Sequence, residues 1–356
     1  MPTPTHTQSQ RGSSELFTNR DQAKRQFEEA LDKPQLTTEY RLSAWNGVGG
    51  QGKTALLEEF ERILKRRTGQ AKERSGQPVG YALIDFENAN NHEIATALLA
   101  LRGQLNKSAG LRFPIFDFAC LRYLAMTQPE VNLKDLQARF FSTGSEYLDS
   151  LLQALNALGE FGGALHLMPG FSLITKYGTK LLGKAGYAYT KWWNRRGIRA
   201  FADIDELSQD ALLRRLPSYF GADLTDALAT EHPPRLVIML DTYEALWRSR
   251  GLKEGPGALR IDEWVRLLVQ DAPGIMFVIA GRDKLRWHEI DKRAGWNHVI
   301  EGHLLDGLTR PDSEALLLKW EIAEPSIRAS MINGACSKQL GEFDNADSKT
   351  DAYLPF

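Results

Sequence analysis

The sequence predicts an α/β fold in which a doubly wound parallel sheet is accompanied by a mainly helical insertion. Two observations lead to this prediction. Near-continuous apolar runs alternate with segments of helical periodicity, a pattern typical of parallel βαβ units whose strands are covered on both faces. The long stretch between the predicted second and third strands instead has helical periodicity over most of its length.

In the N-terminal half of the chain, the hydrophobic pattern predicts two strands, each followed by a helix. An earlier helix is expected over Phe17–Leu31, where Asn19 or Asp21 could cap the start and Pro34 ends the pattern. The elements expected after it are a short strand at Arg41–Asn46, a helix at Thr54–Lys65, a buried strand at Val79–Ala89 and a helix at Asn91–Leu105.

The C-terminal half predicts two more strands. The run RLVIMLDTYEAL, Arg235–Leu246, begins after two prolines and is almost wholly apolar as far as Asp241. A helix over Ile261–Gln270 then leads to the strand GIMFVIAGRD, Gly274–Asp283. Periodicity fades after Trp320, so we expect the tail to be a loop that leads into a region missing from the chain.

A cluster of glycines separates the first strand from the helix that follows it. GVGGQGKT, Gly47–Thr54, fits the pattern G-x-x-x-x-G-K-[S/T] at every required position. Glycines let successive backbone N–H groups surround phosphate oxygens, and the helix N-terminus adds the positive end of its dipole. The alternative, a plain glycine-rich turn, is disfavoured by the strand–helix context.

This pattern predicts a phosphate-binding loop, or P-loop, with a bound nucleotide. We expect Lys53 to reach the β- and γ-phosphates and the Thr54 hydroxyl to join the shell of a Mg²⁺ ion. The candidate nucleotide-binding residues of the loop are Gly47, Val48, Gly49, Gly50, Gln51, Gly52, Lys53, Thr54 and Ala55.

A P-loop also predicts an acidic residue at the end of another apolar strand, beside the metal. Asp241 ends LVIMLD and is the Walker B candidate that would hold Mg²⁺ through water. Glu244 could orient or deprotonate the attacking water, or it could be a surface carboxylate at a helix start. Arg282 ends the next strand, where it would either read the γ-phosphate or form an exposed salt bridge.

These motifs, taken in order, resemble the STAND-class ATPases, which are signal-transducing P-loop NTPases of the AAA+-related branch that includes NB-ARC and NACHT proteins. The segments that carry the resemblance are FTNRDQAKRQFEEAL, GVGGQGKTALL, LVIMLDTYEAL and VIAGRDKLRW. Within this class the chain more closely resembles bacterial ATP-binding proteins that also contain a segment like LLDGLTRPDSEALLL and are often followed by tetratricopeptide repeats. An F-x-x-R motif contributes to the adenine pocket of the family, which implies that role for Phe17 and Arg20.

The resemblance implies an ATPase that binds ATP, ADP and Mg²⁺, hydrolyses slowly and switches its conformation and oligomeric state. Lys53, Asp241, Glu244 and Arg282 would form the catalytic set, and Thr54 and Asp241 would serve the metal. A homo-oligomer on activation and a protein trigger or effector are the implied partners. One departure is that most ATPases of this branch carry the glutamate directly after the aspartate, where this chain has Thr242.

We expect five regions along the chain. They are a disordered lead-in at 1–15, the first part of the NTPase domain at 16–110, a helical insertion at 111–230, the second part of the NTPase domain at 231–325, and a tail at 326–356. STAND proteins normally continue into a repeat-rich sensor, for which this chain has no matching segment.

Composition restricts the class of protein. The 356 residues are 42% hydrophobic and 25% charged, with a formal net charge of -1, which gives no overall attraction to nucleic acid or membranes. The two cysteines, Cys120 and Cys336, lack metal-binding spacing and predict reduced thiols, the histidines show no metal spacing either, and no segment has the apolar length of a membrane span. We therefore expect a cytoplasmic protein.

Two other functions stay open. A module that binds ADP or ATP tightly without hydrolysis would fit the displaced glutamate. A DNA-dependent ATPase, such as a loader or transposition helper, would use the basic insertion, in which Lys176, Lys180 and Lys184 recur every four residues. We favour a solvated helix face for these lysines, and a core position for Phe113, Phe116 and Phe118.

Overall fold

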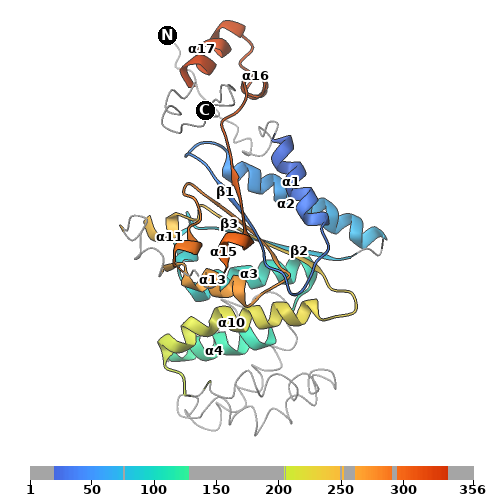
Figure 1. The fold of residues 1–356 in the computed structure, drawn as a ribbon, viewed down its shortest axis with the longest axis vertical. Coiled ribbons are helices and arrows are strands. Elements are labelled where there is room, and N and C mark those ends of the chain that lie inside the picture. Colours follow the sequence, from blue (N-terminus) through green and yellow to red (C-terminus); the bar gives the residue numbers. More distant parts are fainter. Residues whose placement is uncertain are drawn as a thin grey trace, which may run out of the picture.

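The computed structural model describes residues 20–74, 77–127, 204, 206–248, 251, 261–290 and 295–335. Five parallel strands form one sheet in the order β2-β3-β4-β1-β5 (Figure 1). The predicted doubly wound parallel sheet is therefore confirmed. Because β4 lies between β1 and β3, the segment after β4 emerges between the P-loop and the Asp241 turn.

The sheet consists of β1 (Arg41–Asn46), β2 (Val79–Asp85), β3 (Arg235–Asp241), β4 (Met276–Gly281) and β5 (Ile300–Leu304). The helices before the insertion are α1 (Asp21–Asp32), α2 (Lys53–Arg74), the 3₁₀ helix η1 (Ala89–His92), α3 (Ile94–Ala109) and α4 (Pro114–Thr127). Those after it are α10 (Gln209–Leu228), α11 (Ala245–Arg248), α13 (Glu263–Gln270), α14 (Trp287–Ile290), α15 (Trp296–Val299), α16 (Arg310–Lys319) and α17 (Pro325–Ala335).

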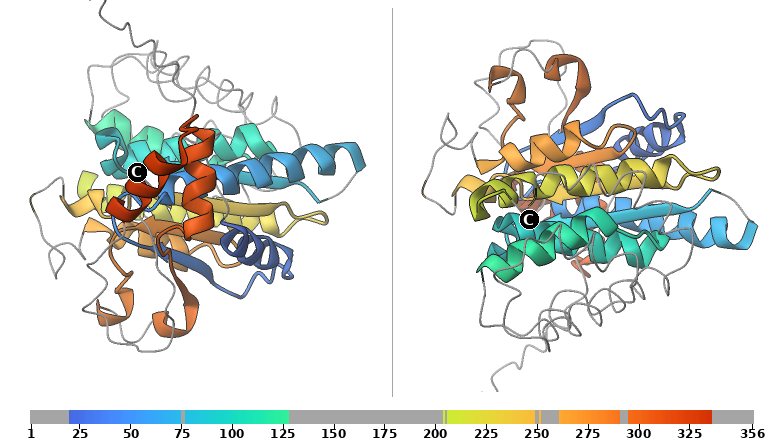
Figure 2. Two further views of the ribbon diagram at one scale, coloured as in Figure 1. Left: turned by 90° about the horizontal axis from the view of Figure 1, so that it is seen from above. Right: turned by 90° about the horizontal axis from the view of Figure 1, so that it is seen from below.

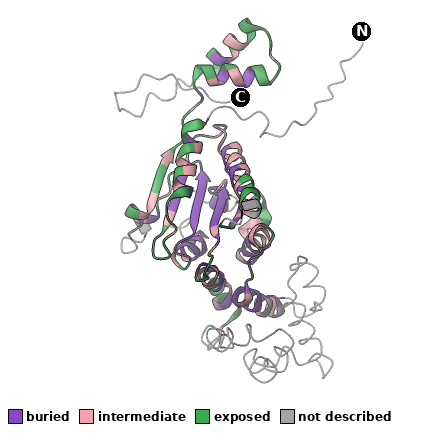
Figure 3. Cartoon of the chain, turned by 90° about the vertical axis from the view of Figure 1, so that its right-hand side faces the viewer, coloured by how far each residue is buried: buried purple, intermediate pink, exposed green. Residues whose placement is uncertain are grey.

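Helices cover both faces of the sheet, and the strands alternate between two cores. In β3, Leu236, Ile238 and Leu240 belong to the core formed with α3, α4, α10 and α13. Val237 and Met239 belong to the opposite core, which contains residues of α1 and α2. The two layers are visible around the sheet in Figure 2, and Figure 3 shows the buried central strands between them.

The strand predicted at Arg41–Asn46 has the same bounds as β1, whereas the other three predicted strands are right in position but too long at their ends. The predicted strand from Arg235 stops at Asp241, and a turn and α11 follow it, because Thr242 takes a positive φ of 50° that ends extended backbone. Similarly, β2 ends at Asp85 rather than Ala89. The edge strand β5 and the helix α17 lie in segments for which the sequence pattern predicted neither.

The described ends of the insertion are helices α4 and α10, which lie side by side beneath the sheet in Figures 1 and 2. Phe113 and Phe116 are 0% exposed and Phe118 is 8% exposed, which confirms their predicted core position. Lys176, Lys180 and Lys184 lie outside the described residues.

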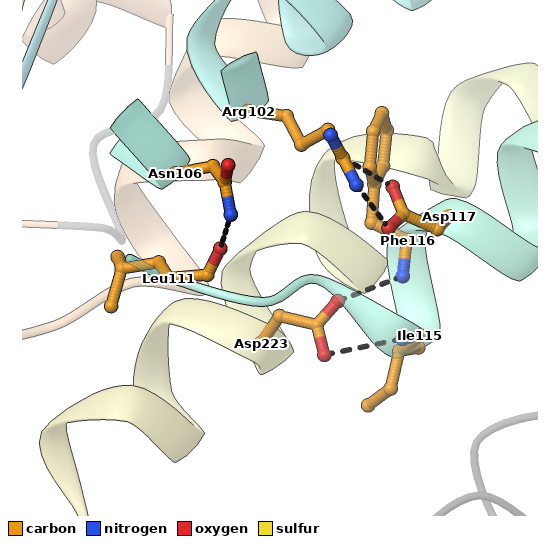
Figure 4. Close-up of polar contacts among 7 residues, drawn as sticks. All are labelled: Arg102, Asn106, Leu111, Ile115, Phe116, Asp117 and Asp223. Carbon is orange, nitrogen blue, oxygen red and sulfur yellow. Dashed lines mark hydrogen bonds and ion pairs between the residues drawn. The ribbon is translucent and has the colours of Figure 1, made fainter. Parts of the chain in front are cut away.

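Buried charges join α3, α4 and α10 (Figure 4). Arg102 forms a two-pronged ion pair with Asp117, with N–O distances of 2.8 and 3.0 Å. Asp223 of α10 accepts the backbone N–H groups of Ile115 and Phe116 at the start of α4. These contacts satisfy free donors of the α4 N-terminus and fix the first helix of the insertion to α10.

Two simpler predictions can be compared with the described part of the chain. Cys120 is buried as a free thiol, as expected, and its burial raises its pKa. Within the described residues, none of the helices combines the length and the hydrophobicity that crossing a membrane requires.

Candidate nucleotide site

The predicted site residues of the strands and loops meet at the carboxyl ends of the parallel strands. The P-loop follows β1, Asp241 ends β3 and Arg282 follows β4. Ligands of open α/β sheets bind outside these strand ends. Asp85, which the sequence analysis did not select, ends β2 directly beside Asp241 in the parallel register.

Glycine is required at several points of the P-loop. Gly50 and Gly52 have φ angles of 83° and 80°, in the region that residues with a Cβ rarely adopt. A Cβ at Gly47 would lie 2.7 Å from the carbonyl oxygen of Leu305 and would also collide with the Gln51 side chain. The glycines therefore serve the shape of the loop, as the motif predicts.

Lys53 lies at the start of α2, and its side chain turns back over the loop. Its Nζ donates hydrogen bonds to the carbonyl oxygens of Gly47 (2.7 Å) and Val48 (2.9 Å). Burial is the main cause that lowers the pKa of Lys53, whereas the nearby carboxylates of Glu244 and Asp241 oppose the shift. The ammonium is thus poised over the loop in a partly desolvated place.

Thr54 and Asp241 face each other across the site. The Thr54 hydroxyl donates a hydrogen bond to the Asp241 carboxylate, and the backbone N–H of Thr242 donates to Asp241 Oδ1 at 2.8 Å. Burial, together with the neighbouring carboxylates of Asp85 and Glu244, raises the pKa of Asp241 to about 6 despite these two donors.

A hydroxyl beside a carboxylate suits Mg²⁺, which keeps several waters and takes the rest of its shell from one or two carboxylates and from phosphates. Among the described residues, no group of three or more His, Cys, Asp or Glu side chains is arranged to hold a metal ion.

Glu244 and Arg282 form a close pair. The Arg282 backbone N–H donates to Glu244 Oε2 at 2.9 Å, and the Arg282 Nε lies 3.1 Å from Oε1. Glu244 is 4% exposed, so it is not the surface carboxylate considered as an alternative. The Arg282 side chain remains 53% exposed and forms its salt bridge inside the site.

Arg20 connects three segments that are distant in the sequence. Its guanidinium donates to the carbonyl oxygens of Gln51 in the P-loop (2.8 Å) and of Asp306 after β5 (2.6 Å). Asp306 was not foreseen, because β5 itself was not predicted. Phe17, the other residue of the F-x-x-R motif, lies outside the described residues.

The remaining loop residues surround this centre. Val48 is 61% exposed at the loop, Gln51 is buried, and Ala55 lies in the first turn of α2. The structure thus brings Arg20, the P-loop, Asp241, Glu244 and Arg282 to one edge of the sheet.

A parallel sheet with a P-loop between its first strand and the next helix, and with an aspartate at the end of a nearby strand, defines the P-loop NTPase fold. No protein-family model matches the chain, and neither does any curated protein sequence. A solved structure, described as that of the Aeropyrum pernix ORC2 protein (ADPNP-ADP complexes), is similar at 12% identity and a TM-score of 0.36. The match covers 88% of this chain but only 56% of that one, so the chain spans just over half of that protein's length.

Proposed function

We propose that this chain binds Mg-ATP and ADP, hydrolyses ATP slowly and acts as a nucleotide-driven switch of the STAND class. The observation that carries the proposal is the P-loop whose Lys53 and Thr54 face Asp241 at the carboxyl ends of the strands. ATP rather than GTP is favoured by the family resemblance, and the sequence has no guanine-reading N-K-x-D motif.

Each residue of the site has a chemical role in this proposal. When nucleotide binds, Lys53 would exchange its hydrogen bonds to the carbonyl oxygens of Gly47 and Val48 for contacts to oxygens of the β- and γ-phosphates. Because the phosphate oxygens are negatively charged, their hydrogen bonds to the ammonium are stronger than those of the neutral carbonyls. Thr54 and Asp241 hold Mg²⁺, which when bound neutralises charge on the phosphates. Arg20, by joining the P-loop to the segment after β5, supports the wall of the adenine pocket.

The Glu244–Arg282 pair suits a slow enzyme. While Arg282 occupies both oxygens of Glu244, the carboxylate is poorly placed to accept a proton from water. A γ-phosphate would compete for the Arg282 guanidinium, because charge-assisted contacts to phosphate are strong. Glu244 would then be free to orient the water while Arg282 reads the phosphate.

Slow turnover is appropriate for a switch, since the γ-phosphate must persist long enough to hold one conformation. In this proposal the two parts of the NTPase domain form the nucleotide site. Assembly into a homo-oligomer and contact with a protein trigger would follow the nucleotide state.

A second function, nucleotide binding without hydrolysis, is favoured by one observation. Thr242 occupies the place where most related ATPases carry the glutamate, and the displaced Glu244 is already paired with Arg282. Such a module would use bound ADP only to stabilise one conformation.

The experiment that separates these functions has two parts. The purified protein is denatured and any released nucleotide is identified by chromatography, and Mg²⁺-dependent phosphate release from ATP is measured in parallel. Released ADP or ATP together with slow turnover supports the switch. Retained nucleotide without turnover supports the non-hydrolysing module, and neither nucleotide binding nor turnover by the folded protein contradicts both.

The DNA-dependent ATPase is tested in the same assay. Phosphate release is measured with and without duplex DNA, and in a variant with Lys176, Lys180 and Lys184 changed to Glu. DNA stimulation that the variant loses would favour this function over the switch.

A further inference from the structure

Asp262 is a buried carboxylate for which the proposed catalysis has no role. It is 2% exposed and immediately precedes α13, but its side chain makes no capping hydrogen bond to that helix. Its Oδ2 instead accepts hydrogen bonds from the Tyr243 hydroxyl (3.0 Å) and the Trp287 Nε1–H (2.9 Å). Arg266, one turn along the helix, donates to Oδ1.

The two donors to Oδ2 belong to the two segments that carry the Glu244–Arg282 pair. Tyr243 precedes Glu244 in the turn after β3, and its backbone N–H donates to the Ala280 carbonyl of β4 at 3.0 Å. Trp287 begins α14, in the segment that leaves β4 through Arg282. A single carboxylate oxygen therefore ties the Glu244 turn to the segment after Arg282.

This connection passes beside a cavity. Tyr243, Glu244, Asp262 and Trp287 all line it, together with Asn46 at the end of β1. The space next to Glu244 is thus not completely filled, although the Tyr243 and Trp287 rings of the two segments pack edge to face with their centroids 6.4 Å apart. The hydrogen bonds to Asp262 add a directional restraint to this aromatic contact.

The pKa values of Tyr243 and Asp262 are consistent with a hydroxyl donor and a carboxylate acceptor. Burial, and next the neighbouring Asp262 carboxylate, raise the pKa of Tyr243 well above its ordinary value, so the hydroxyl stays protonated and remains a donor. The Arg266 guanidinium opposes the rise that burial causes in the pKa of Asp262. Burying a carboxylate has a large desolvation cost. The three donors offset that cost only when they lie at hydrogen-bonding positions around the carboxylate.

We propose that Asp262 is a positioning residue that, through Tyr243 and Trp287, holds Glu244 and Arg282 at the edge of the nucleotide site. In this proposal Asp262 acts on the rate only by fixing the pair. The effect on catalysis rests on the proposed function, whereas the effect on the position of Arg282 does not.

The test uses Asp262→Asn and Tyr243→Phe in the full chain. Asn turns donors toward Tyr243, Trp287 or Arg266, and Phe removes one hydrogen bond while keeping the ring. Hydrogen–deuterium exchange is followed in the peptide that contains the Arg282 amide, which is protected by Glu244. Steady-state kcat and KM for ATP are measured on the same samples.

Both variants are expected to speed exchange at the Arg282 peptide and to lower kcat by about tenfold or more, while KM stays within about twofold. Peptides of α2 and α10 should exchange as in the wild-type protein. Asp223→Asn is the matched control, because it alters another buried carboxylate that lies outside this network. It should leave Arg282 exchange and kcat unchanged.

Unchanged Arg282 exchange in folded Asp262→Asn and Tyr243→Phe would overturn the proposal. So would an equal change in Asp223→Asn, which would indicate general loosening of the fold. If Asp262→Asn fails to fold, the milder Tyr243→Phe decides the result alone. Faster Arg282 exchange in a protein that hydrolyses no ATP would support the positioning role and contradict the proposed hydrolysis instead.

Discussion

At the scale of single residues, the pairing of Glu244 with Arg282 decides what either residue can do. Both oxygens of Glu244 are engaged by Arg282, one by its backbone N–H and one by its side chain. A base held in this way must exchange partners before it can receive a proton. In the proposed function, the pair would therefore link hydrolysis to the arrival of a γ-phosphate.

Glu244→Gln should lower the rate of phosphate release by about tenfold or more and leave ATP affinity close to that of the wild type. The amide can still accept from the Arg282 backbone but cannot take a proton from water. The measurement is single-turnover hydrolysis beside a binding titration. Glu263→Gln, at an exposed position of α13, is the control; equal rates in wild type and Glu244→Gln would remove Glu244 from the catalytic set.

Asp241 makes the metal-free protein sensitive to pH. Its pKa in the folded protein is about 6, above the ordinary value of 3.8. A carboxyl with a raised pKa binds its proton more tightly in the folded state, so the folded protein loses stability as pH rises from about 4 to above 6. Mg²⁺ needs the ionised form and should bind more tightly over the same interval.

Asp241→Asn should therefore stabilise the metal-free protein by about 1–3 kcal/mol at pH 8 and have little effect near pH 4. Urea unfolding at both pH values measures this difference. The same variant should lose Mg²⁺-dependent phosphate release. A variant that is less stable than the wild type at pH 8 would show that the Asp241 charge is well compensated without metal.

Most of the candidate site could be predicted from sequence because its chemistry lies in local motifs. The P-loop pattern gives the loop, and the end of an apolar strand gives Asp241. Contacts such as those of Asp85 and Asp262 could not be predicted, because they depend on strand order and on how α13 packs. Asp85 did carry a usable signal, since like Asp241 it is the acidic residue that follows a buried run.

At the scale of elements, the helices at the base of the insertion depend on buried charge. Arg102 of α3 and Asp117 of α4 have side chains that are 2% and 0% exposed. Such a pair contributes little net stability compared with apolar residues of the same size, but removing one partner is costly because the other charge stays buried. The pair therefore constrains how α4 leaves the core.

Arg102→Met should destabilise the protein by about 3–5 kcal/mol, because the Asp117 carboxylate stays buried without its Arg102 partner. The double variant Arg102→Met/Asp117→Leu should recover a large part of that loss. These two variants and the single variant Asp117→Leu are measured by urea denaturation. A double variant as unstable as the sum of the two single variants would mean that the two charges do not compensate each other.

The sequence did not predict β5 and α17, and in both cases the structure explains why the sequence pattern is weak. Within the described residues the edge strand β5 pairs with β1 alone, and its residues Glu301, Gly302 and Leu304 are exposed, so it shows no apolar run. Helix α17 begins at Pro325, which suits a first helical turn but also ends many helical patterns. The central strands were found because burial on both faces requires a continuous apolar run.

At the scale of the whole molecule, one edge of the sheet gathers residues from the entire described chain. Arg20 comes from the segment before α1, and the site extends to Asp306 beyond β5. A ligand that replaces the contacts of Lys53 and Arg282 would therefore change contacts in segments from both halves of the protein. In the proposed function, this arrangement would be the physical basis for a switch in which nucleotide binding alters the whole domain.

The most direct test of the central claim is a calorimetric titration of ATP and ADP, with Mg²⁺, into the wild-type protein, Lys53→Ala and Lys65→Ala. Lys65 lies on the same helix and pairs with Glu61 on the surface, so it controls for loss of charge. We expect one nucleotide per chain for the wild type and Lys65→Ala, and affinity about 10- to 100-fold weaker for Lys53→Ala. Equal affinity in folded Lys53→Ala, or no binding by the folded wild type, would contradict the account.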